Sequence, residues 1–298
     1  FKRIDKTSEN IDFDLIFDGK KNTSFRPKIV KFFSIIQEYC PYLKDYHLLI
    51  SSSNSFPHSS GIASSASSMS ALSLCIMSLE KKLTLIDDDY FFKKASFISR
   101  IGSGSASRSV YGGVNFWGKH KELNNSSDLY SVKLSKNISP KFNNYRDVIL
   151  IIDDKEKEVS SSVGHGLMND NPFSKVRFNA ANNNITKLLE ILASGNLNDF
   201  CELIEGEALM LHSLMMNSNP SYILMKPETL EVIERIQDFR ENSKIPVCFT
   251  LDAGANVHVL FPENFSKEVM TFIEKELAPL CKGGKFIKDS IGEGPKQF

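Results

Sequence analysis

The stretch Asn54-Ser-Phe-Pro-His-Ser-Ser-Gly-Ile-Ala-Ser-Ser-Ala66 decides how this chain is interpreted. Eleven of the twenty residues at positions 51–70 are serine, which is also typical of a low-complexity linker. The helical interpretation is favoured over a linker because the stretch runs directly into a helical pattern, whose apolar face carries Met69, Leu72, Ile76 and Leu79. Small residues at a helix N-terminus let backbone N–H groups approach an anion closely, so the stretch predicts a phosphate site. A helix N-cap unusually rich in serine remains the alternative.

A second segment of the same kind is Gly102-Ser-Gly-Ser-Ala-Ser-Arg108. Its glycines and serines offer backbone and hydroxyl donors, and the Arg108 guanidinium matches a carboxylate or a phosphate. An ordinary Gly/Ser loop with a solvated arginine would have the same composition. Two such segments in one chain indicate a ligand with several phosphates, or two phosphorylated ligands.

The third segment is Thr250-Leu-Asp-Ala-Gly-Ala-Asn256. Asp252 ends an apolar run and is followed by small residues, so its carboxylate is expected to be accessible at a strand end. Such a group suits a general base or a group that orients a hydroxyl. The residues also fit a simple turn, because Asp and Asn often cap their own backbone.

Composition excludes several classes of protein. The 298 residues carry 36 basic and 36 acidic side chains, which argues against nucleic acid or an anionic membrane as the main partner. The longest apolar run, Val148-Ile-Leu-Ile-Ile152, has the length of a strand. Five scattered cysteines without a CxxC pair predict reduced thiols and a cytoplasmic protein, and no histidine pair has the spacing of zinc ligands.

The pattern of apolar residues predicts an α+β chain with two domains, 1–144 and 145–298, and an active site in the groove between them. Helices are expected at 26–39, from 64 onward, and at 91–98, 173–192, 199–216, 225–239 and 266–277. Strands are expected at 46–50, 148–152, 247–251, 257–261 and 283–288, with one edge strand inside 119–141. The chain opens at Phe1 without a methionine, and we expect a further segment to precede it.

Together the three segments resemble one family. Pro57-His-Ser-Ser-Gly-Ile-Ala-Ser-Ser-Ala66 resembles the Pro-x-x-x-Gly-Leu-x-Ser-Ser-Ala loop of the GHMP small-molecule kinases. With Asn54-Ser-Phe-Pro, the second and third segments are similar to those of the diphosphomevalonate decarboxylases within that superfamily, in the same order. The similarity extends over nearly the whole chain, to Cys281-x-Gly-Gly and Gly292-x-Gly-Pro295.

The resemblance implies an N-terminal domain with a left-handed βαβ unit, a ferredoxin-like C-terminal domain and a homodimer. It also implies ATP-dependent decarboxylation of diphosphomevalonate with Mg²⁺. By position, Asp252 and Arg108 match the catalytic aspartate and the arginine that holds the substrate carboxylate. The resemblance assigns substrate binding to Ser103, Gly104, Ser105, Arg108 and Asn171. It assigns ATP binding to Asn54, Pro57, Ser59, Ser60, Gly61, Ala63, Ser64 and Ser65.

Three departures from the family pattern stand out. The family's opening strand and its Lys-Tyr-Trp-Gly-Lys segment have no counterpart here. Asn171, in Asp170-Asn-Pro172, replaces a serine that contacts phosphate, and Ala255 replaces a usual proline. The alternatives are therefore a mevalonate-type kinase, a decarboxylase of the monophosphate, or a non-catalytic phosphate-binding homologue.

Overall fold

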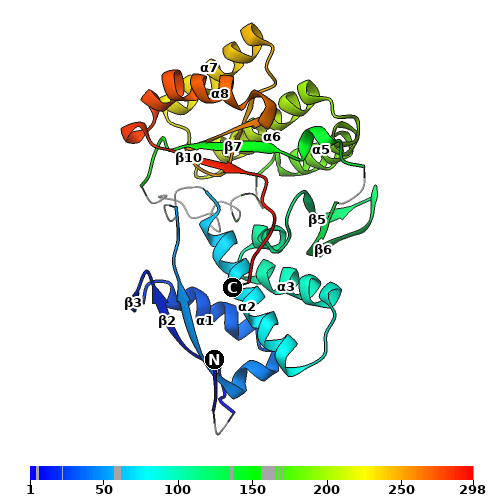
Figure 1. Cartoon of the computed structure of the whole chain (residues 1–298), viewed down its shortest axis with the longest axis vertical. Helices are drawn as coiled ribbons and strands as arrows, with labels where there is room; N and C mark the ends of the chain where they lie inside the picture. Colours follow the sequence, from blue (N-terminus) through cyan, green and yellow to red (C-terminus); the bar gives the residue numbers. More distant parts are fainter. Residues whose placement is uncertain are drawn as a thin grey trace. The chain divides into compact units, whose positions relative to one another are not determined.

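The computed structural model describes residues 1–4, 7–21, 23–56, 62–134, 137–155, 166, 168 and 171–297. The chain forms two compact units of mixed α/β structure, each built on its own four-stranded sheet (Figure 1). Unit 1 comprises Phe1–Pro57, Ala63–Leu134 and Glu293–Phe298, and unit 2 comprises His58–Ile62 and Ser135–Gly292. The division at 144/145 that we expected for the functional domains lies within the second unit and stays a prediction.

The sheet of unit 1 has the strand order β1-β4-β2-β3. Its strands are β1 (Lys2–Arg3), β2 (Asp12–Phe17), β3 (Lys20–Lys21) and β4 (Tyr46–Ser52). β2 runs parallel to β4, with Phe13 opposite Leu48. The helix between these two strands is α1 (Arg26–Ile36), which has a proline in its first turn and buries the predicted face of Ile29, Phe32, Phe33 and Ile36. Unit 1 therefore contains a parallel β-α-β connection, whose handedness stays a prediction.

Two helices and a hairpin complete unit 1: α2 (Ser64–Leu83), α3 (Asp88–Gly102), β5 (Asn115–His120) and β6 (Leu123–Lys133). Ser70 on α2 and Ser96 and Ser99 on α3 are buried with hydroxyls that bond to nearby carbonyls, as Ser70 Oγ does to Ser67 O at 2.9 Å. A buried ion pair between Lys94 and Glu80, 2.8 Å apart, ties α3 to α2. From Ser64 onward, the serine-rich segment is thus a packed helix.

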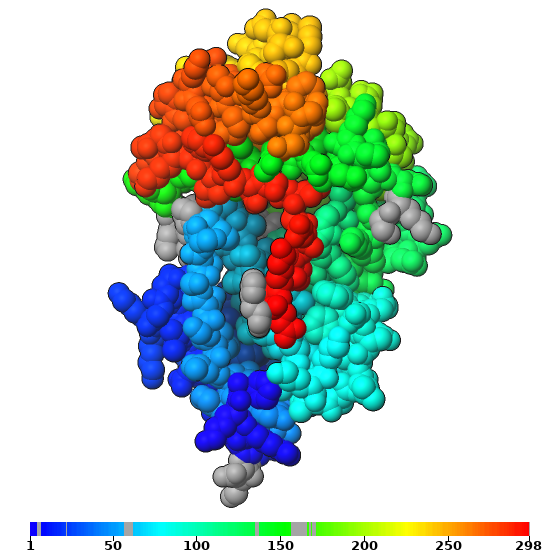
Figure 2. All heavy atoms as spheres, in the orientation of Figure 1, coloured from blue at the N-terminus to red at the C-terminus, as the bar shows by residue number. Residues whose placement is uncertain are grey.

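The end of the chain belongs to unit 1 and lies against its surface, where it is drawn in red in Figure 2. Gly112 makes this approach possible. A Cβ atom at Gly112 would lie 2.1 Å from the carbonyl oxygen of Glu293, so only glycine fits there.

Unit 2 contains an antiparallel sheet with the order β10-β7-β9-β8. Along the chain, the elements of unit 2 are β7 (Tyr145–Leu150), α5 (Ser174–Ser194), α6 (Leu197–Met216), α7 (Pro227–Ser243), β8 (Cys248–Leu251), β9 (Val257–Pro262), α8 (Ser266–Phe272) and β10 (Phe286–Ser290). This β-α-β-β-α-β succession with two added helices is ferredoxin-like, which confirms the expected fold. One face of the sheet carries the core residues Val148, Leu150, Phe249, Leu251, Val257, Val259 and Phe261.

The outer edge of β8 is closed by a side chain from α6. Glu205 is 5% exposed and accepts a hydrogen bond from the backbone N–H of Phe249 at 3.3 Å. Arg240 on α7 neutralises it, with Nη2 2.9 Å from the second carboxylate oxygen. Arg240 also donates to the carbonyl of Val247 at 2.8 Å. The carboxylate therefore replaces the neighbouring strand that β8 lacks on this side.

Some elements differ from those expected. The strand β2 was not predicted, although Phe13 and Leu15 alternate with Asp12 and Asp14. The expected helix 266–277 is α8 followed by a π-helical turn, Ile273–Leu277. The five cysteines are free thiols. Among the described residues, no helix combines the length and hydropathy that crossing a membrane requires.

Candidate functional site

The first candidate anion site lies at the start of α2. Ala63, the N-cap residue, has φ +57°, which is uncommon for a residue with a Cβ and marks a tightly constrained turn. Its carbonyl accepts hydrogen bonds from the N–H groups of Ala66 and Ser67. These are the first hydrogen bonds of the helix. Ser64 is buried and Ser65 is half-buried. Of the other predicted ATP contacts, Asn54 is half-buried before the loop, and Pro57, Ser59, Ser60 and Gly61 lie outside the described residues.

The second segment meets the first at its serines. Ser65 Oγ and Ser103 Oγ are 3.2 Å apart, so the two segments that the sequence singled out separately are joined within unit 1. Gly102 permits this packing, because a Cβ there would lie 2.5 Å from the sulfur of Met69 on α2. Gly104 similarly leaves room for the indole ring of Trp117. The hydroxyls of Ser65 and Ser103 therefore form one polar patch beside the N-terminus of α2.

Arg108 lies on a 3-10 helix, Gly104–Val110, which hydrogen bonds of Ser107 hold in place. Ser107 is buried, its hydroxyl donates to the carbonyl of Gly104 at 2.9 Å, and its carbonyl accepts from Ser96 Oγ at 2.8 Å. Ser105 is half-buried and Arg108 is exposed at the surface of this short helix. An exposed guanidinium on a short helix that is held by buried hydrogen bonds suits the recognition of a carboxylate or phosphate.

Asp252 lies in unit 2, directly after β8, in the turn that leads to β9. Its side chain is exposed, and Oδ1 accepts a hydrogen bond from the N–H of Ala253 at 2.7 Å. The turn is held by buried groups: Thr229 Oγ1 donates to the carbonyl of Ala255 at 2.8 Å, and Asn256 Oδ1 accepts from the N–H of Asp153 at 2.9 Å. The expectation of an accessible carboxylate at a strand end is met.

Asn171 has a different setting. It is 7% exposed, its Nδ2 donates to the carbonyl of Leu214 at 3.0 Å, and its Oδ1 accepts from the N–H of Phe173 at 2.9 Å. In this arrangement the amide links the start of α5 to α6. Its expected contact with a phosphate stays a prediction.

Sequence reasoning did not find two histidines near Asp252. His212 on α6 has Nε2 3.1 Å from the backbone oxygen of Asp252. His258 on β9 has Nδ1 2.8 Å from Asp147 Oδ2. Burial alone would lower the pKa of His258, but the bond to Asp147 and the charges of Asp252 and Asp289 raise it above its usual value. A single histidine within an apolar pattern does not reveal from the sequence which distant carbonyl or carboxylate it will bond to.

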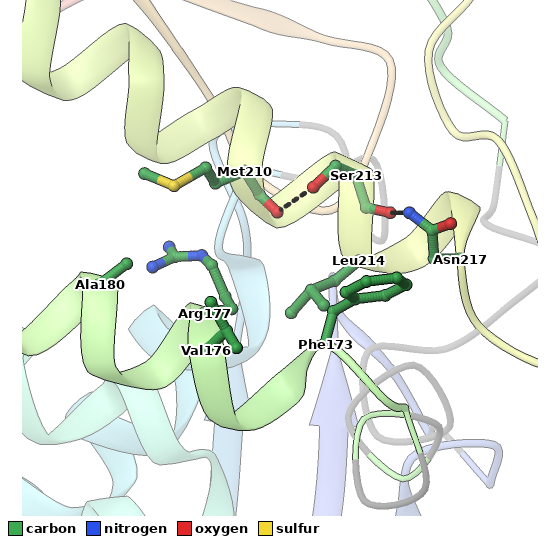
Figure 3. A pocket seen from close by; sticks show the side chains of 8 residues that line it. All are labelled: Phe173, Val176, Arg177, Ala180, Met210, Ser213, Leu214 and Asn217. Carbon is green, nitrogen blue, oxygen red and sulfur yellow. Dashed lines mark hydrogen bonds between the residues drawn. The ribbon is translucent and has the colours of Figure 1, made fainter.

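None of the predicted site residues lines the groove between α5 and α6 (Figure 3). Asn171 lies two residues before Phe173, which lines it. Arg177 crosses the groove toward Glu207 on α6, 2.5 Å away. The groove is lined by Phe173, Val176, Arg177, Ala180, Met210, Ser213, Leu214 and Asn217. Its apolar lining does not match the polar ligand that the motifs indicate.

Two family models match the chain in sequence order. The diphosphomevalonate decarboxylase-like N-terminal domain matches residues 3–129, and the mevalonate 5-diphosphate decarboxylase C-terminal domain matches residues 147–296. Ser65, Ser103 and Arg108 fall within the first match, and Asp252 falls within the second.

Individual decarboxylases of mevalonate phosphates are also similar to this chain. A diphosphomevalonate decarboxylase of Ganoderma lucidum is 27% identical over 79% of this chain, which spans 58% of that protein's length. A phosphomevalonate decarboxylase of Haloferax volcanii is 24% identical over 78% of the chain and 66% of its own length.

Solved structures share the fold. The mevalonate diphosphate decarboxylase of Staphylococcus aureus has a TM-score of 0.80 and 26% identity, covering 96% of this chain and 82% of that one. A structure described as MDDEF in complex with MVAPP, AMPPCP and magnesium has a TM-score of 0.79 and 24% identity, covering 97% and 83% of the two chains. Since the C-terminal family model alone spans half of the sequence, this chain belongs to the diphosphomevalonate decarboxylase family.

Proposed function

We propose that the chain catalyses the ATP-dependent decarboxylation of (R)-5-diphosphomevalonate in the mevalonate pathway of isoprenoid biosynthesis. The products are isopentenyl diphosphate, ADP, phosphate and CO2. The observation that carries the proposal is that both family models match in order; it is supported by the exposure of Arg108 and Asp252 and the partial exposure of Ser65 and Ser103. The finer assignment is a cytoplasmic homodimer.

ATP is proposed to bind at the N-terminus of α2, where Ala63, Ser64 and Ser65 begin the helix. Backbone N–H groups and the positive end of the helix dipole favour the phosphates there. The remaining ATP contacts are assigned to Asn54, Pro57, Ser59, Ser60 and Gly61.

Mg²⁺ fits the same place. It prefers oxygen ligands, keeps several waters and is usually held by substrate phosphates with few protein groups. Among the residues that the structure describes, no cluster of three carboxylate, imidazole or thiol groups is present, so phosphates would supply most of the ligands. The hydroxyls of Ser65 and Ser103, 3.2 Å apart, are hard oxygen donors at this place. When bound, the ion neutralises charge that develops on the transferred phosphoryl group.

The substrate is proposed to bind along the second segment. Ser103, Gly104 and Ser105 donate to its diphosphate, and Asn171 is assigned a further contact. Arg108 holds the carboxylate in line with the C3–O bond that breaks. A strong ion pair in the ground state would slow loss of CO2, so the contribution of Arg108 is orientation.

Asp252 acts on the C3 hydroxyl. It orients or deprotonates this group, whose oxygen then attacks the terminal phosphorus of ATP and releases ADP. The C3–O bond of the phosphorylated intermediate breaks and phosphate leaves. The electron pair of the bond to the carboxylate then forms the new double bond, and CO2 departs.

The second candidate is decarboxylation of the monophosphate, which the resemblance to the Haloferax volcanii protein favours. The test is to incubate the purified chain with Mg-ATP and either 5-diphosphomevalonate or 5-phosphomevalonate, measuring ADP, phosphate and CO2. Equal amounts of all three from the diphosphate support the main proposal. Greater kcat/KM for the monophosphate supports the second candidate. ADP without CO2 identifies a kinase, and no turnover of either compound identifies a binding protein.

A further inference from the structure

His212 connects the body of unit 2 to the turn that carries Asp252. It lies on α6, is 2% exposed and has Nε2 3.1 Å from the carbonyl oxygen of Asp252. A carbonyl oxygen only accepts hydrogen bonds, so Nε2 carries the proton and donates. The bond therefore fixes one backbone group of the turn to a buried helix.

The backbone group held by His212 is the one that sets the direction of the Asp252 side chain. The C=O of Asp252 and the N–H of Ala253 belong to the same planar peptide unit. This N–H donates to Asp252 Oδ1 at 2.7 Å. When His212 holds the carbonyl, it also fixes the direction of the N–H and, through that bond, the orientation of the carboxylate.

Other contacts hold the turn without a hydrogen bond to this peptide. Ala253 packs against a small cluster with Leu214 and Met215 on α6. Thr229 on α7 donates to the carbonyl of Ala255, three residues after Asp252. Thr229 is buried, like His212, but it holds a different peptide, and its Oγ1 also accepts from the N–H of Lys226 at 3.1 Å.

We propose that His212 is a positioning residue for the reaction: it orients the Asp252 carboxylate through the Asp252–Ala253 peptide, without contacting the substrate itself. The inference rests on the proposed role of Asp252 at the C3 hydroxyl. It concerns a residue that neither the motifs nor the charge pattern of the sequence identifies.

The experiment compares four variants with the wild type. His212→Gln keeps a donor near the position of Nε2, His212→Asn has an amide too short to reach, and His212→Leu fills space without a donor. Thr229→Val is the control, because it removes a buried hydrogen bond from the same turn, together with the bond from the Lys226 N–H at the start of α7. For each protein, kcat, both KM values and the free energy of unfolding are measured.

We expect His212→Asn and His212→Leu to lower kcat about 10- to 100-fold, since small misplacements of a reacting group have effects of this size. KM for both substrates should stay within about three-fold, and His212→Gln should recover most of kcat. Thr229→Val should lose stability but keep kcat near the wild-type value. Equal losses of kcat in Thr229→Val and His212→Leu, or no recovery by glutamine, would show that His212 only stabilises the fold.

A readout that does not need turnover separates this inference from the proposed function. Without the histidine donor, the amide of Ala253 should exchange its hydrogen faster in His212→Leu than in the wild type and in His212→Gln. Unchanged exchange overturns the positioning role, whether or not the chain is active. If the wild type is inactive but the Ala253 amide exchanges faster only in His212→Leu, the proposed function is refuted and the positioning role of His212 is not.

Discussion

Replacing Asp252 by asparagine removes the negative charge and the basic oxygen while preserving the shape of the turn. The wild-type side chain is exposed, and its Oδ1 accepts from the N–H of Ala253. An asparagine Oδ1 can accept the same bond. We therefore expect the free energy of unfolding to change by no more than about 0.5 kcal/mol, the usual range for surface substitutions.

The effect on turnover should be much larger. Removal of a general base typically lowers the rate about 10²- to 10⁴-fold, which corresponds to about 2.7–5.4 kcal/mol in the activation barrier. Binding of ATP and substrate should change much less, because the carboxylate acts mainly in the transition state. If Asp252 only shaped the turn, asparagine would serve equally well.

The assay follows release of CO2 and phosphate from 5-diphosphomevalonate and Mg-ATP, with urea unfolding of the same preparations. Asp238→Asn is the control, because it removes another exposed carboxylate of unit 2, on α7. Its turnover should equal that of the wild type. A folded Asp252→Asn variant that retains more than about a tenth of wild-type turnover would remove Asp252 from the mechanism.

Three further predictions concern single side chains. Arg108→Ala should lower turnover about 100-fold and leave binding of a fluorescent ATP analogue unchanged; loss of nucleotide affinity with normal substrate affinity would place Arg108 in the ATP site instead. Ser65→Glu should abolish ATP saturation by size and charge while thermal stability persists, because an acidic side chain suits a helix N-terminus; normal saturation would contradict the placement of ATP. His258→Gln should destabilise the protein most below about pH 6.5 and progressively less as the pH rises, because the raised pKa of His258 stabilises the fold only while the ring is protonated. Urea unfolding from pH 5 to pH 9 checks this, and a difference independent of pH would contradict it.

The sequence was most informative where one local pattern decides the structure. The apolar face of α1 and the helix that follows the serine-rich loop depend on spacing within a single element, and both were predicted correctly. β2 was missed because its alternation of Phe13 and Leu15 with two aspartates is short, although Asp18-Gly19 directly after it is a hairpin-turn signal and does lead to β3. The helix predicted at 266–277 has the expected bounds, but the apolar pattern could not show that the backbone changes to a π-helical turn at Ile273–Leu277.

The candidate site was predictable as a set of motifs but not as an arrangement. Small residues around Ser65 and Ser103 indicated two anion sites, yet only tertiary packing brings the two hydroxyls together. Asn171 was expected to contact a phosphate, and no local pattern could reveal that its amide joins two helices. The bond from His212 to the Asp252 carbonyl links residues 40 positions apart, beyond the reach of any spacing argument.

The carboxylate of Glu205, which closes the edge of β8, also affects what the chain does before it is fully folded. A strand edge with free N–H groups can pair with the same strand of another molecule, and β8 is apolar enough for such pairing to persist. Because Glu205 comes from α6, this edge is protected only after α6 has docked and Arg240 has neutralised the acid. We therefore expect a chain in which α6 has not yet docked to be open to association through the edge of β8. Conditions that release this helix should favour aggregation before they unfold the rest of the sheet.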